Sequence, residues 1–583
     1  MINIDFNRLL AQLRISGTNA LLILAALVGI ATALGAIGFT ALIRFANHIF
    51  FGMTDEYLTH FGGGGVFKWW LPLIPMLGGL CVGPIIHYFA SEARGHGVTE
   101  VINAVVRLGG IIRPRVAVVK TVASAICIGS GGSAGREGPI VQIGSAIGST
   151  IGQFFSMSGE RVRVLVGCGA AAGIASVFNA PIAGVLFSLE VILGDFAIRT
   201  FSPVLISSVV ASVITRSILG NYPAFQVTPY ELESVWEIII YSIMGAVLGA
   251  VAVLFTKTLH KTEDFFERLK INSLIKPGIG GLLLGGIAIF YPQVLADGYE
   301  TITLTLNGDM AFALLVPLIF LKIIGTSMTL GSGSSGGVFA PSLFIGAVAG
   351  GAFGVLANWL FPGAVGHPGA YALVGMAGLV AGTTHAPMTA ILIIFEITND
   401  YHIILPLMMT VTFSTLMARS LLPHSIYTFK LFQRGIEIRG GRDINVLRAH
   451  KVRDVMRTQF ETMTAATTLG KIFTRFEQSN ENYFVVIDGE SRLLGVLSIE
   501  DVRSLMSRRT VDQLIVAQDI VRANPSTLKP DDDLESATKA FALRDTRLLP
   551  VVEPGDSRRV VGILARDDLT NFYNRRLVDL MRQ

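Results

Sequence analysis

The sequence predicts two domains of different fold class: an all-α polytopic membrane domain with broken, non-spanning helices, and a C-terminal α/β domain. Three observations support this prediction. Hydrophobic residues make up 51% of the 583 residues, and the mean hydropathy is +0.59. Charge changes abruptly along the chain, because residues 1–430 hold 42 of the 88 Asp, Glu, Lys and Arg side chains and the last 153 residues hold the other 46. Each part also contains an internal repeat.

The change in charge sets the expected domain boundaries. We place the membrane domain at residues 1–430 and divide it into repeat halves at roughly 20–220 and 235–425. A linker is expected at 431–451, and the C-terminal domain at 452–583.

Apolar segments recur throughout the membrane domain. A helix needs about 20 apolar residues to cross a bilayer, and several of these segments are too short or are interrupted by Gly and Pro. Such segments often mark the binding site of a transporter, and the 63 glycines of the chain favour close helix packing. The segments are 20–50, 69–90, 116–128, 162–194, 202–219, 235–257, 275–291, 312–330, 338–361, 371–397 and 402–422.

Composition argues against several other classes of protein. The net charge is only +4 and no Lys/Arg-rich run is present, so no nucleic-acid partner is expected. The three cysteines lie in apolar segments without a CxxC pair, which predicts neither a disulfide framework nor a metal site. The polar, amphipathic N-terminus does not resemble a cleaved signal peptide. No HExxH, GxSxG or P-loop pattern occurs, so the chain is not expected to be an enzyme.

Two pairs of matching segments reveal a duplication inside the membrane domain. KTVASAICIGSGGSAGREGP at 120–139 matches KIIGTSMTLGSGSSGGVFAP at 322–341, and NAPIAGVLFSLE at 179–190 matches HAPMTAILIIFE at 385–396. Both pairs occur in the same order, which indicates a duplicated unit. Repeats of this kind commonly have inverted topology around a midplane binding site, although the sequence alone leaves the relative orientation of the halves open.

The Gly/Ser-rich loops of the first pair are typical of an anion site. Each loop leads into an apolar helix, and a helix N-terminus presents N–H groups and a partial positive charge. Glycines let the backbone approach a ligand closely. Two such helix ends inside a membrane would bind an anion weakly enough for turnover. The alternative is that these glycines serve only helix packing.

Glu137, within GREGP at 135–139, is the candidate gate. Carboxylates inside a membrane are costly and usually functional. This carboxylate is itself an anion, so it can occupy a helix-end site and leave that site when it is protonated. The alternatives are a helix-capping role and a local ion pair with Arg136.

With these motifs, nearly all of residues 1–430 resembles the CLC family of chloride channels and chloride/proton antiporters. The resemblance rests on GREGP, on GGVFAP at 336–341 and on FNAPIAGVLF at 178–187. It implies a CLC-like inverted repeat and a homodimer with one anion pathway per subunit. It also implies a multi-pass protein in the cell membrane, in contact with lipid.

The resemblance implies roles for particular residues. Glu137 corresponds to the gating glutamate, and the backbone amides of Val338 and Phe339 correspond to anion ligands. Tyr427 falls where the family places an anion-coordinating tyrosine, with an interfacial aromatic as the alternative. The candidate anion-binding residues are His96, Gly97, Gly135, Arg136, Glu137, Gly138, Val338, Phe339 and Tyr427.

Two departures from the family pattern affect selectivity and mechanism. The family's first anion loop usually reads GSGIP, whereas this chain reads GHGVT at 95–99. His96 therefore replaces a serine, and its imidazole can donate a hydrogen bond or carry charge when protonated; alternatively it turns away and only the backbone binds. The second departure is Val191, at the position where the family's antiporters usually carry a proton-relaying glutamate. Glu190 instead matches a glutamate that channels and antiporters share.

The C-terminal domain contains a second duplication. One unit spans about 452–508 and the other about 516–575, each with two apolar strands separated by a turn and followed by a helix. The pair resembles CBS motifs, which fold together as one α/β module, and the resemblance places it in the cytoplasm. Such modules often bind adenine nucleotides, which makes Ser498, Asp501 and Asp568 candidate ligands of a nucleotide. A purely structural or dimerising module is the alternative.

Taken together, the sequence favours passive conduction of chloride or other small anions through a pore gated by Glu137, because Val191 cannot relay a proton. A chloride/proton antiporter, which would also carry protons, is the runner-up. A magnesium transporter with CBS domains is a distant alternative, since it would need several acidic residues along its pore. No cofactor is required for transport, and an adenine nucleotide at the CBS pair is the candidate ligand.

Overall fold

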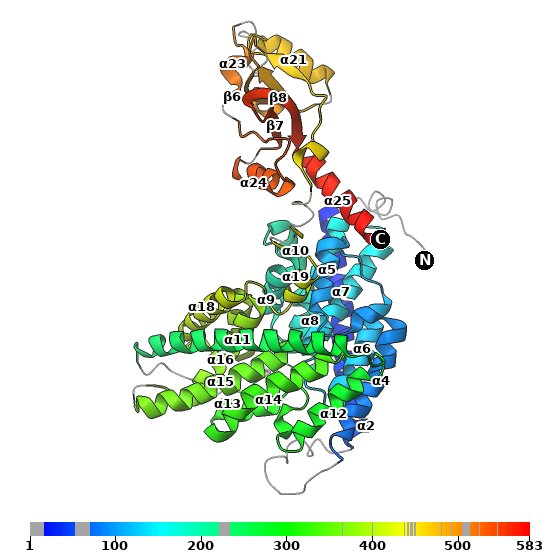
Figure 1. Cartoon of the computed structure of the whole chain (residues 1–583), viewed down its shortest axis with the longest axis vertical. Helices are drawn as coiled ribbons and strands as arrows, with labels where there is room; N and C mark the ends of the chain where they lie inside the picture. Colours follow the sequence, from blue (N-terminus) through cyan, green and yellow to red (C-terminus); the bar gives the residue numbers. More distant parts are fainter. Residues whose placement is uncertain are drawn as a thin grey trace. The chain divides into compact units, whose positions relative to one another are not determined.

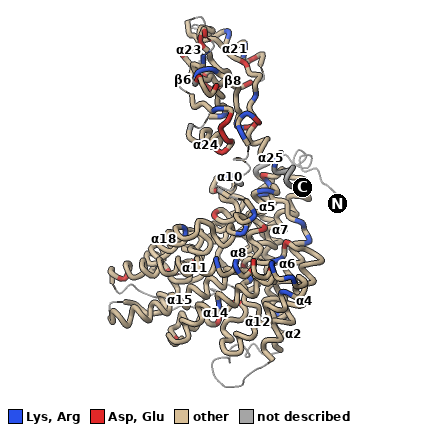
Figure 2. Tube along the Cα trace, viewed as in Figure 1, with Lys and Arg blue, Asp and Glu red and all other residues tan. Residues whose placement is uncertain are grey.

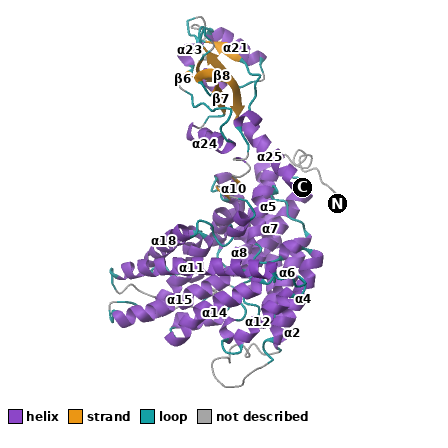
Figure 3. Ribbon diagram, viewed as in Figure 1, coloured by secondary structure: helices purple, strands orange, loops and turns teal. Residues whose placement is uncertain are grey.

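A computed structural model describes residues 17–52, 70–220, 225, 234–363, 365–398, 400–436, 438–439, 442–443, 447, 450–479, 481–490, 492–503, 514–523, 525–544 and 546–582. The chain forms two compact units, Met1–Arg434 and Gly435–Gln583 (Figure 1). The described part of the first unit is built from helices, and the named strands all lie in the second unit (Figure 3).

The helices of the first unit differ widely in length, as the interrupted apolar segments predict. Several are too short to span a bilayer, with ten residues in α5, seven in α9 and nine in α13. In chain order they are α2 (Gly17–Phe51), α4 (Leu73–Phe89), η2 (Ser91–Ala93), α5 (Val98–Arg107), α6 (Arg115–Gly129), α7 (Glu137–Phe154), α8 (Gly159–Phe178), α9 (Pro181–Phe187), η3 (Ser188–Leu193), α10 (Ile198–Leu219), α11 (Glu237–Arg268), α12 (Lys276–Ala288), η4 (Pro292–Val294), α13 (Tyr299–Asn307), α14 (Phe312–Gly331), α15 (Phe339–Leu360), α16 (Pro368–Thr384), α17 (Pro387–Thr398), α18 (Ile404–Leu421) and α19 (Phe429–Gln433).

Long apolar helices make the first unit a multi-pass membrane domain. Among the described residues, seven helices are long and apolar enough to cross a bilayer. Lys, Arg, Asp and Glu are sparse along this unit and dense in the second (Figure 2). The seven spans are Asn19–Phe51, Gly159–Phe178, Ile198–Leu219, Glu237–Arg268, Phe312–Gly331, Phe339–Leu360 and Ile404–Leu421.

The duplication is visible in how the helices pack. Helix α7 packs against α8 in the first half, and α15 packs against α16 at the matching place in the second half. Both crossings bring glycines together: a Cβ on Gly144 would lie 2.2 Å from the carbonyl oxygen of Gly169, and a Cβ on Gly346 would lie 2.5 Å from that of Gly375. A side chain at any of these positions would push the helices apart. These glycines therefore serve close helix packing in both repeats.

Two carboxylates tie the halves to each other reciprocally. Glu396 in α17 accepts hydrogen bonds from the amides of Ile182 (3.0 Å) and Ala183 (2.7 Å) at the start of α9. Glu190 in η3 accepts bonds from the amide (2.8 Å) and the hydroxyl (2.7 Å) of Thr389 at the start of α17. Each half thus supplies the anion that stabilises a helix N-terminus of the other half. Glu190 is occupied by this capping contact.

The second unit is an α/β domain made of two parts. Strands β3, β4, β5 and β6 form one sheet in that order, with β3 and β4 parallel and the other pairs antiparallel, and β7 pairs with β8 as an antiparallel hairpin. Each part has its own apolar core, one around Phe484 and the other around Phe541. The elements are β1 (Ile438–Arg439), β2 (Arg442–Asp443), η5 (Val452–Asp454), β3 (Thr462–Thr464), α21 (Leu469–Gln478), β4 (Tyr483–Ile487), β5 (Leu493–Ser498), α22 (Ile499–Arg503), α23 (Ala517–Ile520), β6 (Arg522–Ala523), α24 (Leu534–Arg544), β7 (Leu548–Glu553), β8 (Asp556–Ala565) and α25 (Arg566–Arg582).

The expected linker at 431–451 contains secondary structure of its own. Helix α19 runs into its start, and β1 and β2 pair as a short antiparallel hairpin within it. The boundary between the two compact units falls at Arg434 and Gly435.

Candidate anion pathway

Three loops meet inside the first unit, and they contain most of the predicted site. The amide of Gly135 donates to the carbonyl of Gly337 (2.8 Å), and the amide of Gly337 donates back to the carbonyl of Gly135 (2.6 Å). The amide of Gly95 donates to the carbonyl of Ser334 (2.9 Å). The loop before α5 and the matched loops of the two repeats are therefore joined by backbone hydrogen bonds.

Glycine is needed where these loops touch. A Cβ on Gly138 would lie 2.5 Å from the carbonyl oxygen of His96 and 2.9 Å from the Cα of Gly337, both backbone atoms. Gly97 has a φ of +82° and would place a Cβ 2.6 Å from Oε1 of Gln142. A side chain at Gly138 would separate the loops, and at Gly97 it would be strained by the positive φ and would press on the Gln142 side chain.

Three helix N-termini begin at these loops. Helices α5, α7 and α15 start directly after Gly97, Arg136 and Val338, and none of these three residues caps its helix with a side-chain hydrogen bond. A helix N-terminus without such a cap presents N–H donors and a partial positive charge. The loops thus bring together the kind of group that binds an anion through backbone dipoles.

The carboxylate of Glu137 lies at one of these helix ends. Its side chain is 1% exposed, and Oε2 accepts a hydrogen bond from the amide of Ala340 in the first turn of α15 (3.3 Å). Oε1 accepts a bond from the hydroxyl of Tyr299 (2.6 Å). The guanidinium of Arg136 lies over the Tyr299 ring, 5.1 Å from its centroid. Glu137 therefore joins the two repeats at the position where an anion would meet α15.

Tyr299 was not identified from the sequence. It begins α13, directly after Gly298, which has a φ of +77°. The pair Gly298–Tyr299 corresponds to Gly97–Val98 before α5 in the first repeat, and both glycines adopt a positive φ. The shared signal is a single glycine, too short to stand out in a sequence comparison. This tyrosine donates to the candidate gate from the opposite repeat.

Two lysines begin the matched segments of the two repeats, and the sequence alone indicates no function for them. Lys120 donates to the carbonyls of Ala93 (3.0 Å) and Gly95 (2.7 Å), and Lys322 donates to those of Val294 (3.0 Å) and Ala296 (2.9 Å). Both side chains are fully buried. Each lysine thus holds the loop before the short helix of its repeat, and Lys120 adds positive charge beside the loop that carries His96.

His96 and Tyr427 lie side by side below the joined loops. Their ring centroids are 5.4 Å apart, and the Tyr427 ring also meets Phe187 edge-on at 6.5 Å. Tyr427 is 1% exposed, so it is a buried side chain of this chain rather than an interfacial aromatic. Phe339 packs on Phe178 with ring centroids 5.4 Å apart. The predicted aromatic and imidazole groups therefore lie in one region.

Val191 lies in the π-helical segment η3, which packs against α5. A carboxylate at this position would lie next to the helix that follows His96. Valine offers no proton-binding atom, so the loss of the relay at position 191 stays a prediction from the sequence.

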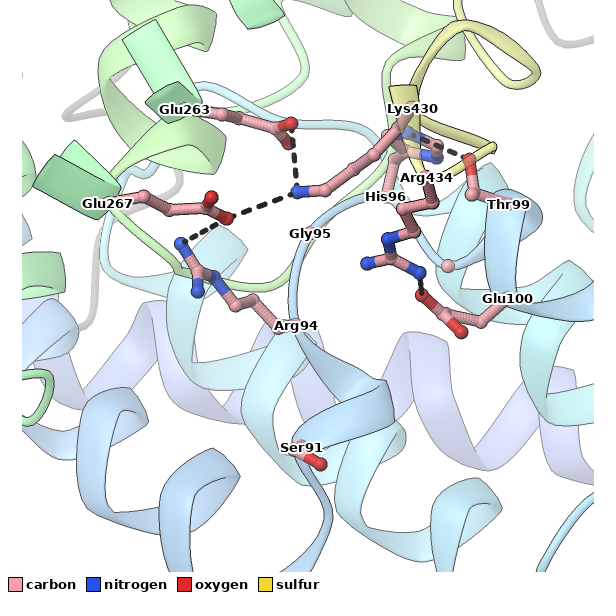
Figure 4. A pocket seen from close by; sticks show the side chains of 11 residues that line it. Ser91, Arg94, Gly95, His96, Thr99, Glu100, Glu263, Glu267, Lys430 and Arg434 are labelled. Carbon is pink, nitrogen blue, oxygen red and sulfur yellow. Dashed lines mark hydrogen bonds and ion pairs between the residues drawn. The ribbon is translucent and has the colours of Figure 1, made fainter. Parts of the chain in front are cut away.

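A cavity of about 90 Å³ opens beside His96 and Thr99 (Figure 4). Its other charged lining groups come from three segments: Arg94 and Glu100 near α5, Glu263 and Glu267 on α11, and Lys430 and Arg434 on α19. The six are paired, through Lys430–Glu263 (3.0 Å), Lys430–Glu267 (3.5 Å), Arg94–Glu267 (3.7 Å) and Arg434–Glu100 (3.0 Å). The cavity that borders His96 is therefore lined mainly by charged and polar groups.

The candidate nucleotide ligands lie in the second unit and already have protein partners. Asp501 Oδ2 accepts bonds from the amide (3.0 Å) and the hydroxyl (2.6 Å) of Ser498, at the junction of β5 and α22. Asp568 Oδ1 accepts a bond from the guanidinium of Arg457 (2.7 Å), and this bond raises the pKa of Arg457. A ribose would have to compete with these groups for Asp501 Oδ2 and Asp568 Oδ1, whereas Oδ2 of Asp568 is buried without a partner among the described groups.

Comparison with known proteins identifies the type of both units. The family model described as Voltage gated chloride channel matches residues 78–419, and the CBS domain model matches residues 452–508 and 516–575. The chain is 34% identical over 421 residues to the H(+)/Cl(-) exchange transporter ClcA of Vibrio campbellii, covering 70% of this chain and 88% of that protein. It is 29% identical over 637 residues to the chloride channel protein CLC-f of Arabidopsis thaliana, covering 95% of this chain and 80% of that protein.

A solved structure supports the same fold. The X-ray crystal structure of a slow cyanobacterial Cl−/H+ antiporter superposes with a TM-score of 0.64 at 27% identity, covering 71% of this chain and 97% of that chain. The predicted fold class, a helical membrane domain of this type followed by a CBS pair, is confirmed.

Proposed function

Because the chain belongs to the voltage gated chloride channel family, the CLC family, we propose that it carries chloride and other small anions across a membrane along a pathway gated by Glu137. One observation supports the gate above all: the Glu137 carboxylate accepts a hydrogen bond from the Ala340 amide at the start of α15. A carboxylate in that place competes with a permeating anion. Protonation removes its charge, so the anion can take its place.

The proposed pathway runs from the charged cavity, past His96 and Tyr427, to the helix ends that Glu137 closes. Backbone N–H groups and helix dipoles supply most of the attraction along it. Such sites bind an anion without a full positive charge in direct contact, which keeps binding weak enough for the ion to leave.

We favour passive conduction over exchange, because Val191 provides no proton-binding group in η3. Exchange of chloride for protons is the second candidate. It is favoured by the similarity to ClcA of Vibrio campbellii and to the cyanobacterial antiporter, both described as proton-coupled.

Proteoliposomes that hold the purified chain separate the two candidates. For passive conduction, a chloride gradient moves chloride while protons stay at electrochemical equilibrium. For exchange, the same gradient drives protons uphill through the protein. The absence of chloride flux, with magnesium flux or product formation in its place, would contradict the proposal altogether. Light scattering on the purified chain in detergent, with the detergent mass subtracted, should give a particle of two 62.5 kDa chains, because we also propose a homodimer.

Apolar side chains of α10 and α18 are exposed on the single chain and must contact either lipid or a second subunit. Ile198 is 84% exposed, Val213 60% and Leu416 61%. Side chains of this size and polarity need lipid or protein around them. We further propose that the protein resides in the cell membrane with its CBS pair in the cytoplasm.

For the CBS pair, an adenine nucleotide is the proposed ligand and a structural or dimerising role the alternative. Oδ1 of Asp568 is bonded to Arg457 and Oδ2 of Asp501 to Ser498, so a ribose hydroxyl would compete for these two atoms. Oδ2 of Asp568 has no partner among the described groups and is the oxygen we propose for the ribose. Calorimetric titration of the full chain with ATP decides between the two, since a structural module gives no binding heat.

A further inference from the structure

We propose that His96 makes anion binding at the inner part of the pathway dependent on a proton: the imidazole binds an anion only after it takes up a proton at Nδ1. This inference rests on the proposed function, since it concerns the anion that the pathway carries. It assigns a proton-binding group, His96, to the part of the pathway next to the charged cavity, in a chain whose relay position holds Val191.

The hydrogen bonds around Thr99 determine which ring nitrogen of His96 carries hydrogen. The Thr99 hydroxyl donates its single hydrogen to the carbonyl of Tyr427 at 2.7 Å. It lies 3.3 Å from Nε2 of His96 and can only accept a bond from that atom. Nε2 therefore carries the hydrogen, and in a neutral imidazole Nδ1 has the free lone pair.

Nδ1 is buried without a protein partner. His96 is 4% exposed, and its Nδ1 has no hydrogen-bond partner among the protein groups that the structure describes. A buried polar atom left in this way costs about 1–3 kcal/mol, and such atoms commonly have a functional role. The backbone of His96 is held in place by Gly138, which packs on its carbonyl.

The neutral and the protonated forms of His96 interact with an anion in opposite ways. A lone pair on Nδ1 repels an anion, whereas a protonated Nδ1 donates a hydrogen bond and brings a positive charge. Proton and anion therefore favour each other's binding, and the coupling acts equally in both directions.

The charges around His96 strengthen this coupling. The cavity cations Arg94, Lys430 and Arg434 are each paired with a carboxylate, but Lys120 of α6 donates only to carbonyl oxygens in the described contacts. When Lys120 is protonated, its charge therefore opposes proton uptake by His96 until an anion offsets it. The titratable and charged groups around His96 are Glu100 of α5, Lys120 of α6, His260, Glu263 and Glu267 of α11, Lys430 of α19, and Arg94, Tyr427 and Arg434 outside these helices. Glu137 of α7 acts electrostatically on the neighbouring Tyr427.

His260 of α11 is a second buried imidazole close to His96. Its Nδ1 lies 2.8 Å from the carbonyl of Thr256 and must donate to it, its Nε2 has no partner among the described protein groups, and its ring is tilted against that of Phe429 at 4.8 Å. His260 contributes to the electrostatic potential at His96. Because His260 can also take up a proton, a pH series alone does not assign an effect to His96, and a variant at position 96 is needed.

The test is chloride binding to the full-length protein in detergent, measured by equilibrium dialysis with radioactive chloride at several pH values. Glu137→Gln serves as the background, because the gate carboxylate also competes with the anion as it ionises. In this background we expect chloride affinity to fall by up to about tenfold per pH unit as His96 loses its proton. Adding His96→Ser, which keeps a neutral hydroxyl donor, should make the affinity independent of pH.

His402→Ser is the matched control, since its side chain is 67% exposed and lies in the loop before α18. It should leave the pH dependence of the Glu137→Gln protein unchanged. Chloride affinity that is constant with pH in Glu137→Gln would overturn the inference and leave the proposed function standing. Failure of wild type and Glu137→Gln to bind chloride at any pH would overturn both.

A second measurement covers the case in which His96→Ser does not fold. Calorimetry of chloride binding to Glu137→Gln in buffers of different ionisation enthalpy reports protons taken up with the anion. We expect an uptake that approaches one proton per chloride where His96 is mostly neutral before binding. Chloride binding without proton uptake at every pH would contradict the inference.

Discussion

Glu137→Gln is expected to carry chloride at a rate that falls much less steeply with rising pH than the wild-type rate, because only the pH dependence that His96 contributes is left. The amide has the shape of a protonated carboxyl and does not ionise. In wild type the ionised carboxylate occupies the place of the anion at the start of α15. The protonated fraction falls about tenfold per pH unit once the group is mostly ionised, so wild-type flux can fall by the same factor.

Chloride efflux from proteoliposomes at equal internal and external pH measures this effect. Glu300→Gln is a suitable control, because Glu300 lies on the exposed side of the first turn of α13, next to Tyr299. It should keep the wild-type pH response. A Glu137→Gln protein that slows with pH as steeply as wild type would show that another group gates the pathway.

Gly138→Ala is expected to reduce chloride flux by at least roughly tenfold. Its Cβ would lie 2.5 Å from the His96 carbonyl oxygen and 2.9 Å from the Gly337 Cα, and neither backbone atom can rotate away. Forcing a methyl group into a packed site costs about 1–3 kcal/mol. Since a 1.4 kcal/mol change in binding is tenfold, displacement of the three loops should largely remove the anion site.

Gly286→Ala in α12 is the control for Gly138→Ala. It adds the same methyl group to a helix at a place that is not part of the three loops. A Cβ on Gly286 would meet nothing within 4 Å, so the substitution should keep wild-type flux and stabilise the helix by up to about 1 kcal/mol. Flux assays on both variants, after each elutes as a single species in detergent, give the comparison. Equal flux in the two variants would mean that the loop contacts at Gly138 do not shape the pathway.

Much of the fold was predictable because its signals are long. These signals are the apolar segments, the change in charge after residue 430 and the two repeat pairs. Each extends over many residues, so a few atypical residues do not obscure it. The sequence could not reveal the reciprocal caps, since Glu190 and Glu396 look like corresponding residues of one repeat. Only the three-dimensional arrangement shows that each bonds to the other half.

The site was predicted less completely, and the omissions share a cause. Residues in long motifs, such as Glu137 in GREGP and Phe339 in GGVFAP, were identified, and the structure brings their loops together. Tyr299 was missed because the segment around Gly298 matches its partner around Gly97 at little more than the glycine itself. What the two segments share is backbone conformation, which one sequence does not display.

The exchange of caps between the halves has a consequence for how the protein is made. Glu396 is synthesised 214 residues after Ile182, which at about 5–20 residues per second is a delay of roughly 10 to 40 seconds. During that interval the start of α9 lacks its carboxylate, and Glu190 has been made 199 residues before the amide of Thr389. A nascent first half therefore carries an uncapped helix end and an unsatisfied anion in or near the bilayer. Neither half can satisfy these groups alone. A chain truncated between the halves would keep the start of α9 without its carboxylate and Glu190 without its hydrogen-bond donors.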